Sequence, residues 1–235
     1  AGVPSLLLAQ GAPSFTTHYV PGVEGIKGAS LPPPGFYVRD YNIWYFADRL
    51  NDADGNKVPL NVDAFVYANL LRGIWITDWK VLGGYVGMDM IVPFVNTSLD
   101  VKNGSTTLYD ESIPGLSDLY FEPLTLSWHG QQYDAAFGYS FFAPTACSSP
   151  GTAKPGKGFW THMITLGGTV YFDEQKTWSF SALNRYEFNS EEKDTGITPG
   201  QAWTIEWGLS KAIRPTVEIG LAGYYQLQTT TDSGA

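Results

Sequence analysis

The clearest pattern in the chain is a two-residue alternation of apolar and polar side chains between residues 60 and 96. In the first run, 60–76, one face carries Val62, Ala64, Val66, Ala68 and Leu70, and the other carries Asn61, Asp63, Phe65, Tyr67 and Asn69. In the second run, 80–96, one face carries Leu82, Val86, Met88, Met90, Val92 and Phe94, and the other carries Gly83, Tyr85, Gly87 and Asp89. Successive strand side chains point to opposite sides of a sheet, so each run predicts a strand with one apolar face. Residues 77–79 remain for the turn.

Both predicted strands are longer than the five or six residues that are usual in soluble sheets. A tilted strand needs roughly 9–11 residues to cross a bilayer, and each run is long enough to do so. Nine strands of this kind are predicted along the chain, at 36–47, 60–76, 80–96, 118–128, 131–142, 161–172, 177–188, 201–211 and 216–229. The pattern therefore indicates an all-β, transmembrane antiparallel up-and-down β-barrel.

The connections between these strands support that fold. Long polar connections at 47–60, 97–117, 143–160 and 189–200 alternate with short ones at 77–79, 129–130, 173–176 and 212–215. Barrels of the bacterial outer membrane have short periplasmic turns and longer outer loops. Bacterial single-chain barrels have even strand numbers, and an open sheet edge in lipid would leave backbone groups unpaired. We therefore expect further strands after Ala235.

Residues 1–35 show no sustained periodicity and end in three prolines and a glycine, Pro32 to Gly35. Proline supplies no donor to a sheet, so this stretch is predicted as an N-terminal arm, with the barrel at 36–235. Two interpretations remain open at this point. The arm is either a flexible terminus or a segment inserted in the lumen that narrows it. The apolar residues 6–8, Phe15 and Tyr19 favour an ordered segment.

Alternation also predicts which side chains face the lumen. A charge facing lipid at the midplane costs about 2–4 kcal/mol for Arg or Lys and less for acids, so ionised residues are expected inside. The residues predicted to line the pore and the substrate path are Asp63, Phe65, Tyr67, Asn69, Tyr85, Asp89, Asp134, Arg185, Glu187, Glu206, Glu218 and Tyr224. They form either a paired network that fills the barrel or a wall that selects solutes. Alternation does not assign a face to Glu122, and Arg39 and Asp40 must face opposite sides.

Composition narrows the functional classes. Aromatic residues make up 15% of the chain beside 26 glycines, which suits aromatic girdles and close strand packing. The formal net charge of −9 argues against a nucleic-acid partner, since phosphate contacts need a basic surface. The single cysteine, Cys147, rules out an internal disulfide and a metal site built from cysteines.

No catalytic or metal motif is predicted. Residues 52–56 look like the start of a calcium loop, but Lys57 stands where that loop needs glycine. His18, His129 and His162 are scattered, and no G-x-S-x-G, H-E-x-x-H or P-loop pattern is present. We expect no enzyme activity, cofactor or metal. An outer-membrane Ser/His hydrolase stays open as an alternative, because a catalytic triad needs no fixed spacing. Tryptophans near strand ends predict interfacial belts, with a sugar-binding platform as the other interpretation.

Three stretches of the chain resemble a known family. They are VPGVEGIKGASLPPPGFYVRDYNIWYFADRLNDADGN, YVGMDMIVPFVNTSL and DLYFEPLTLSWH. These stretches are similar to the meta-pathway phenol-degradation family of outer-membrane channel proteins. The resemblance implies a Gram-negative outer-membrane channel of twelve strands, associated with the catabolism of aromatic compounds, and three strands beyond Ala235. It does not imply an enzyme.

The sequence thus predicts a monomeric, passive outer-membrane channel for uptake of small hydrophobic or aromatic molecules. Its expected partners are outer-membrane lipid or detergent and these solutes, with no nucleic acid. Two alternatives stay open: a general small-solute porin, and an outer-membrane enzyme or structural barrel with a closed lumen.

Overall fold

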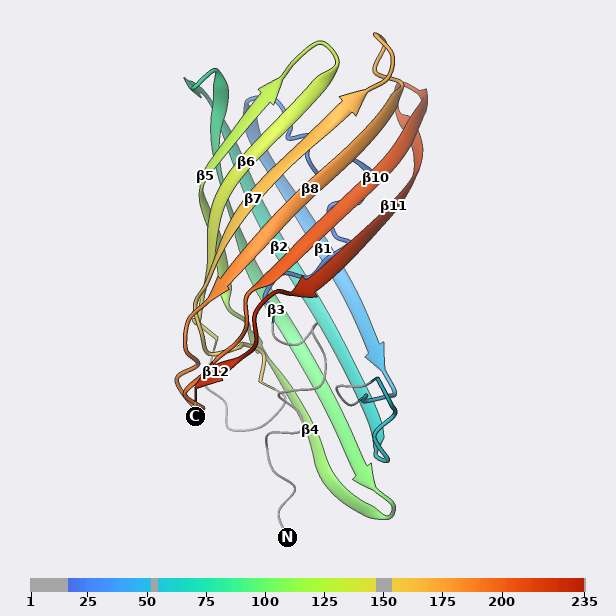
Figure 1. Ribbon diagram of the computed structural model, residues 1–235, viewed down its shortest axis with the longest axis vertical. Coiled ribbons are helices and arrows are strands. Elements are labelled where there is room, and N and C mark those ends of the chain that lie inside the picture. Colours follow the sequence, from blue (N-terminus) through green and yellow to red (C-terminus); the bar gives the residue numbers. More distant parts are fainter. Residues whose placement is uncertain (1–16, 52–54, 147–153, 235) are drawn as a thin grey trace.

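The structure is a computed structural model that describes residues 17–51, 55–146 and 154–234. Most of these residues form one long antiparallel sheet that curls around its own inner face (Figure 1). Along the sheet the strands follow the order β1-β2-β3-β5-β6-β7-β8-β10-β11, and β4 pairs with β3. Each strand on this path pairs with the next one along the chain, as in an up-and-down barrel, once β4 and β9, which lie off the path, are left out. This confirms the predicted fold class.

The elements have the following bounds: η1 (Gly25–Lys27), β1 (Gly35–Ala47), β2 (Asn61–Val81), β3 (Gly84–Asn103), β4 (Thr106–Leu116), β5 (Leu119–His129), β6 (Tyr133–Ala143), β7 (Thr161–Tyr171), β8 (Trp178–Asn189), β9 (Ile197–Thr198), β10 (Ala202–Arg214), β11 (Val217–Gln228) and β12 (Ser233–Gly234). All nine predicted strands are present. The turns from β2 to β3, β5 to β6, β7 to β8 and β10 to β11 gather at one end of the sheet, the upper end in Figure 1. The tip of the β3–β4 hairpin and the long connections lie at the other end.

The turn between β2 and β3 was predicted at residues 77–79, and that position is wrong. Strand β2 continues to Val81, and the turn consists of Leu82 and Gly83, whose φ angles are 51° and 80°. Two positive φ angles are what a tight hairpin turn of the primed type requires. Residues 77–79 lie inside β2, where the register against β3 shifts between Ile76 and Lys80. The Thr77 hydroxyl bridges this shift by donating to the Val86 carbonyl at 2.7 Å.

The predicted long loop at 97–117 is also wrong, because most of it is a β-hairpin. Strand β3 runs on to Asn103, and β4 returns beside it from Thr106. The hairpin begins at Pro93, where β3 changes partner from β5 to β4. The Pro93 carbonyl accepts from the Ser117 N–H at 2.9 Å on that side of the strand, which is also the side where proline has no N–H to donate. The missing donor explains why the pairing forks there.

Strand β5 has an irregularity that settles the face of Glu122. The register of β5 against β6 shifts between Phe121 and Leu124, on either side of Pro123. An extra residue in one strand reverses the alternation beyond it. Glu122 and Thr125 are therefore both buried on the inner face, while Leu124 is exposed on the outer face. A strict period of two could not have produced this assignment.

The outer face of the sheet is predominantly apolar on β5, β6, β7, β8, β10 and β11 and at the start of β1. Exposed large side chains on it include Phe36, Val38, Ile164, Leu166, Val170, Phe180, Trp207, Leu209, Ile219, Leu221 and Leu227. They alternate with buried polar residues such as Thr165, Thr169, Ser181 and Ser210 on the inner face. A soluble protein does not expose so large a band of apolar side chains, so this face is suited to lipid.

The N-terminal arm, residues 17–34, lies against the inner face of the sheet. Its short 3-10 helix η1 packs over β8, β10 and β11. Gly208 makes this approach close, because a Cβ there would collide with the Ile26 backbone. A Cβ at Gly220 would collide first with Leu209 O and Ser210 Cβ of β10 and would also crowd the Ile26 side chain. Ala29 is fully buried beside Gly167 of β7. The dark blue trace inside the curl in Figure 1 is this arm.

The packing of η1 gives a first testable prediction. Replacing Gly208 with Val should lift η1 from the sheet, since the new side chain meets the Ile26 backbone, which cannot rotate away. We expect the variant to fold as a barrel and to conduct ions better than the native chain in a planar bilayer. Gly168→Ala is the matched control, because its Cβ would meet only the Asp134 carbonyl at an ordinary 3.7 Å. Equal currents from both variants would contradict a tightly packed arm.

Some predictions concern residues outside the described ranges. These are the apolar residues 6–8 and Phe15 of the arm, Asp52 and Asp54 of the calcium-like loop, and Cys147. Across the described parts of the chain, no helix has the length and apolar character needed to cross a membrane.

Candidate functional site

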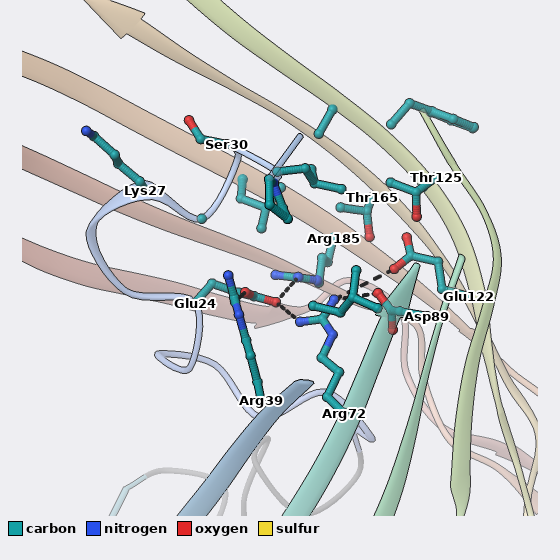
Figure 2. A pocket seen from close by; sticks show the side chains of 18 residues that line it. Glu24, Lys27, Ser30, Arg39, Arg72, Asp89, Glu122, Thr125, Thr165 and Arg185 are labelled. Atoms are coloured by element: carbon teal, nitrogen blue, oxygen red, sulfur yellow. Dashed lines mark hydrogen bonds and ion pairs between the residues drawn. The ribbon is translucent and has the colours of Figure 1, made fainter. Parts of the chain in front are cut away.

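The inner face holds a network in which one carboxylate of the arm meets three arginines of the sheet. Arg72 of β2 and Arg185 of β8 each donate to the same oxygen of Glu24, Oε1, at 2.9 Å. Arg39 of β1 donates to the other oxygen, Oε2, at 3.4 Å. We call Arg39, Arg72 and Arg185 the arginine cluster. Figure 2 shows the cluster converging on Glu24 from separate strands.

Two of the arginines are also anchored by carboxylates of the sheet itself. Arg72 Nη2 donates to Asp89 of β3 at 2.6 Å, and Arg185 Nη1 donates to Glu206 of β10 at 2.7 Å. All four of these side chains are largely buried, with exposed fractions of 12% or less. Hydrogen-bonded ion pairs of this kind hold the guanidinium groups in fixed directions. The arm thus docks onto a charge pattern that the strands have already built.

The ionisation of Glu24 follows from this setting. Burial by itself raises the pKa of Glu24, but the charges of Arg72 and Arg185 outweigh it and bring the pKa down to about 2. An opposite charge within a few Å favours the ionised form of a carboxyl group. Glu24 is therefore a carboxylate at neutral pH.

Further contacts fasten the arm on both sides of Glu24. The backbone N–H groups of His18 and Tyr19 donate to Glu187 Oε1 at 2.9 and 3.1 Å. The Tyr19 hydroxyl donates to Glu206, and its ring lies 4.2 Å from the Arg185 guanidinium. The Gly22 N–H also donates to Glu206. Glu187 and Glu206 therefore both hold backbone N–H groups of the arm, and Glu206 also accepts from the Arg185 side chain.

The arm is fixed near the loop end of the sheet by His18. Its Nε2 lies 3.0 Å from Asp118, and its Nδ1 lies 2.7 Å from the Thr161 hydroxyl. Burial lowers the pKa of His18 to about 4 although the hydrogen bond to Asp118 opposes that change. Asp118 in turn accepts from the backbone N–H groups of Ala146 and Lys157, so it joins the arm to the connection between β6 and β7.

The Thr161–His18–Asp118 arrangement resembles a hydrolytic triad in outline only. Thr161 is fully buried, and its hydroxyl lies 2.6 Å from Asn189 Oδ1. A nucleophile must reach its substrate, which a fully buried hydroxyl does not. The ring of His18 is also covered, by stacking on Phe142 and an edge contact with Phe159. These contacts favour a structural role in holding the arm.

A small cavity adjoins the arginine cluster. It has a volume of about 60 Å³ and is lined by Glu24, Arg72, Asp89, Thr125, Thr165 and Arg185 among others. Three buried polar atoms of these residues have no hydrogen-bond partner: Arg72 Nε, Asp89 Oδ1 and Arg185 Nε. Unpaired buried polar atoms are uncommon in proteins and indicate a place for water or a ligand. Within the described residues, no three His, Cys, Asp or Glu side chains are placed to hold a metal ion.

Eight of the residues predicted to line the pore lie on the inner face. They are Tyr85, Asp89, Asp134, Arg185, Glu187, Glu206, Glu218 and Tyr224. Asp134 accepts from Tyr171 at 2.6 Å, and Glu218 pairs with Lys27 of the arm at 2.8 Å. Tyr224 lies beside Gly22. Whether they touch a passing solute stays a prediction.

The four other predicted pore residues, Asp63, Phe65, Tyr67 and Asn69, face outward, and their assignment is wrong. The face of β2 is set by Arg72, which pairs with Glu24 and Asp89 inside the sheet. An unbroken register back to Asn61 then turns the odd-numbered residues of the first half of β2 outward. The polar members are satisfied within the outer face, since Asn69 donates to Asp40 at 2.7 Å and Tyr67 to Asn42 at 2.8 Å. Asp40 thus faces outward and Arg39 inward.

Among solved structures, the chain is similar to an outer membrane channel from Pseudomonas putida F1, with a TM-score of 0.72 and 14% sequence identity. The alignment covers 89% of this chain and 76% of that one, and at such identity it concerns the fold. No curated protein matches the chain. A family model described as "Putative MetA-pathway of phenol degradation" matches residues 47–235. The chain belongs to this family.

Membership in the phenol-degradation family confirms the resemblance predicted from the sequence. The structural similarity confirms the predicted antiparallel β-barrel fold. The family match includes Arg72 and Arg185, whereas Glu24 and Arg39 precede its first residue. The arginine cluster therefore combines two residues inside the matched region with one outside it.

Several residues of the site were missed by sequence reasoning. Glu24 lies in an aperiodic stretch, and Arg72 shares its parity with the apolar run that was assigned to lipid. One signal could have located Arg72, namely that a charged residue near the middle of a spanning strand must face inward. Nothing in the sequence pairs Glu24 with strands β2 and β8, because those contacts span 48 and 161 residues.

Proposed function

We propose that the protein is a passive outer-membrane channel for small hydrophobic or aromatic molecules. The observation that carries this proposal is the division between the two faces of the sheet. An apolar outer face surrounds an inner face on which charged and polar side chains gather around a packed arm. A barrel built in this way offers a polar route across a membrane. The sequence contains no nucleotide-binding motif, so transport driven by the solute gradient fits best.

The preference for aromatic solutes rests on the family and on the inner face. The family model names phenol degradation, which deals with aromatic compounds. Tyr85 of β3 and Tyr224 of β11 lie on the inner face and are partly exposed and exposed, respectively. Tyrosine offers both a ring for stacking and a hydroxyl for hydrogen bonds. We infer that the arm and these residues together narrow the route and set its preference.

Liposome swelling tests this function. Vesicles that contain the refolded protein should swell faster in an uncharged aromatic solute such as phenol than in a sugar of similar or smaller size. Equal rates for both would favour the alternative of a general small-solute porin. No swelling and no bilayer current, with the barrel folded by its heat-modifiable gel mobility, would favour a closed structural barrel or an enzyme.

The inward carboxylates give a prediction for ion selectivity. We expect Asp89→Asn and Glu206→Gln each to shift the reversal potential in a salt gradient toward anion preference. Each change removes one negative charge beside the route and leaves an arginine, Arg72 or Arg185, with less compensation. Asp40→Asn is the matched control, since this carboxylate lies on the outer face. An unmoved reversal potential in both inner variants would show that these acids do not border the ion path.

A further inference from the structure

The strands themselves orient the two buried arginines of the arginine cluster, without help from Glu24. Arg72 uses Nη2 for Asp89, and Arg185 uses Nη1 for Glu206, so both side chains are oriented by carboxylates of neighbouring strands. Their remaining terminal nitrogens, Arg72 Nη1 and Arg185 Nη2, meet at one point. That point is Glu24 Oε1, 2.9 Å from each nitrogen. The sheet therefore presents two guanidinium groups that converge on a single carboxylate oxygen.

The second carboxylate oxygen also has a partner from the sheet. Arg39 Nη1 lies 3.4 Å from Glu24 Oε2, and the Arg39 side chain is 45% exposed. Arginine is the side chain best suited to carboxylates, because its planar fork of donors matches their two oxygens. In this site Arg72 and Arg185 are buried and held in place, whereas Arg39 is accessible to solvent. Among the residues that the structure describes, Glu24 is the only carboxylate that forms ion pairs with all three arginines.

An independent observation points to a ligand at the same place. Arg72 Nε and Arg185 Nε are buried and lack hydrogen-bond partners, and both side chains line the cavity of about 60 Å³. Leaving a buried donor unpaired is costly, which makes water or a polar ligand the expected occupant of such a space. The apolar side chains of Ile74 and Leu183 line the cavity too. They would suit a ring attached to a carboxylate.

We propose that the arginine cluster is the binding site for the carboxylate of a small aromatic acid, and that Glu24 occupies this site when no solute is bound. This proposal rests on the channel function proposed above and names its solute class. Exchange is a simple competition: the solute carboxylate takes the place of Glu24 between Arg72 and Arg185. Because Glu24 is tethered, its effective concentration is of the order of mM for a short flexible link. The native channel therefore binds the acid weakly and releases it again.

Benzoate is the probe for this site, and benzamide is its uncharged counterpart. Binding is measured on the refolded full chain in detergent, from the ligand-dependent rise of the unfolding temperature. Glu24→Gln removes the competing charge and keeps the shape of the side chain. We expect benzoate to bind this variant about tenfold more tightly than the native chain, because the competent state is no longer occupied by the tethered carboxylate. Benzamide should bind both chains equally weakly.

Two further variants separate this site from a general loosening of the arm. His18→Ala removes the 3.0 Å contact of the arm with Asp118, away from the cavity, and leaves the arginine cluster and Glu24 in place, so it should not show the tenfold gain. Adding Arg39→Gln to Glu24→Gln should reverse most of the gain. If Glu24→Gln fails to fold, Glu24→Asp retains the charge on a shorter side chain and should give an intermediate gain.

The possible results are distinguishable. Equal benzoate affinity in native and Glu24→Gln chains, or an equal gain in His18→Ala, would overturn the carboxylate site. A gain that inorganic phosphate reproduces in full would reduce the proposal to a general anion site and overturn the aromatic-acid assignment. Because binding is measured without current, a silent bilayer would count against the channel function and not against the site.

Discussion

Deleting residues 1–30 is expected to raise the single-channel conductance several-fold. Residues 17–30 of the deleted segment lie on the inner face, where η1 packs over β8, β10 and β11. Their removal would clear that space while every strand from β1 onward keeps its sequence. The measurement is the current of the refolded protein in a planar bilayer at fixed voltage and salt. Heat-modifiable gel mobility would show that the barrel still forms.

A substitution that breaks one ion pair of the arm but keeps the arm in the chain is the comparison for this deletion. Lys27→Ala removes one arm contact, the 2.8 Å pair with Glu218, and should raise conductance far less than the deletion. Unchanged conductance after deletion would remove the arm from the conducting route. An increase in both variants to the same level would mean that the arm is released as one unit once any ion pair breaks.

Replacing Arg185 with Leu should cause the largest loss of stability of any single change in the network. Arg185 contacts Glu24, Glu206 and Tyr19, and its side chain is only 6% exposed. Removing one partner of a buried ion pair costs about 3–5 kcal/mol, because the other charge stays buried without compensation. The expected result is a drop of this size in the free energy of unfolding, measured by urea titration in detergent or lipid.

An exposed ion pair is the matched control for Arg185. Lys154 and Asp194 lie 2.7 Å apart, with side chains 38% and 66% exposed. Lys154→Ala should cost less than about 1 kcal/mol, since exposed pairs are screened by water. A similar small loss for Arg185→Leu would show that the inner network is as hydrated as the loops. It would then contribute little to holding the arm.

The sequence defined the strands because the alternation of side chains is a local property. Strands β5, β6, β7, β8, β10 and β11 alternate between apolar residues on the outer face and mostly small or polar residues on the inner face over about ten positions, except at the Pro123 shift. This is enough to predict β-strands, their facing and the lipid side. Alternation also gave the short turns and long connections, and with them the outer-membrane barrel. The errors at 77–79 and 97–117 arose where a register shift and a hairpin changed the local pattern.

Facing in β1 and β2 depended on contacts that no local pattern contains. The even-numbered residues from Val62 to Leu70 are all apolar, so that face is predicted to meet lipid and the face with Tyr67 and Asn69 to meet the lumen. The structure reverses both, because Arg72 must meet Glu24 and Asp89 inside the sheet. A single buried charge fixes the parity of the whole strand, since moving it to lipid costs more than turning several apolar side chains inward.

By itself, the sequence determined the strands, most of their faces, the barrel fold and the family. These follow from the period of two, which each strand carries alone. The tertiary structure alone decided where the arm lies and that Glu24 meets Arg39, Arg72 and Arg185. The physical reason is that the arm has no periodicity of its own. Its position is set by ion pairs with strands far away in the chain, and such pairs exist only after the sheet has curled.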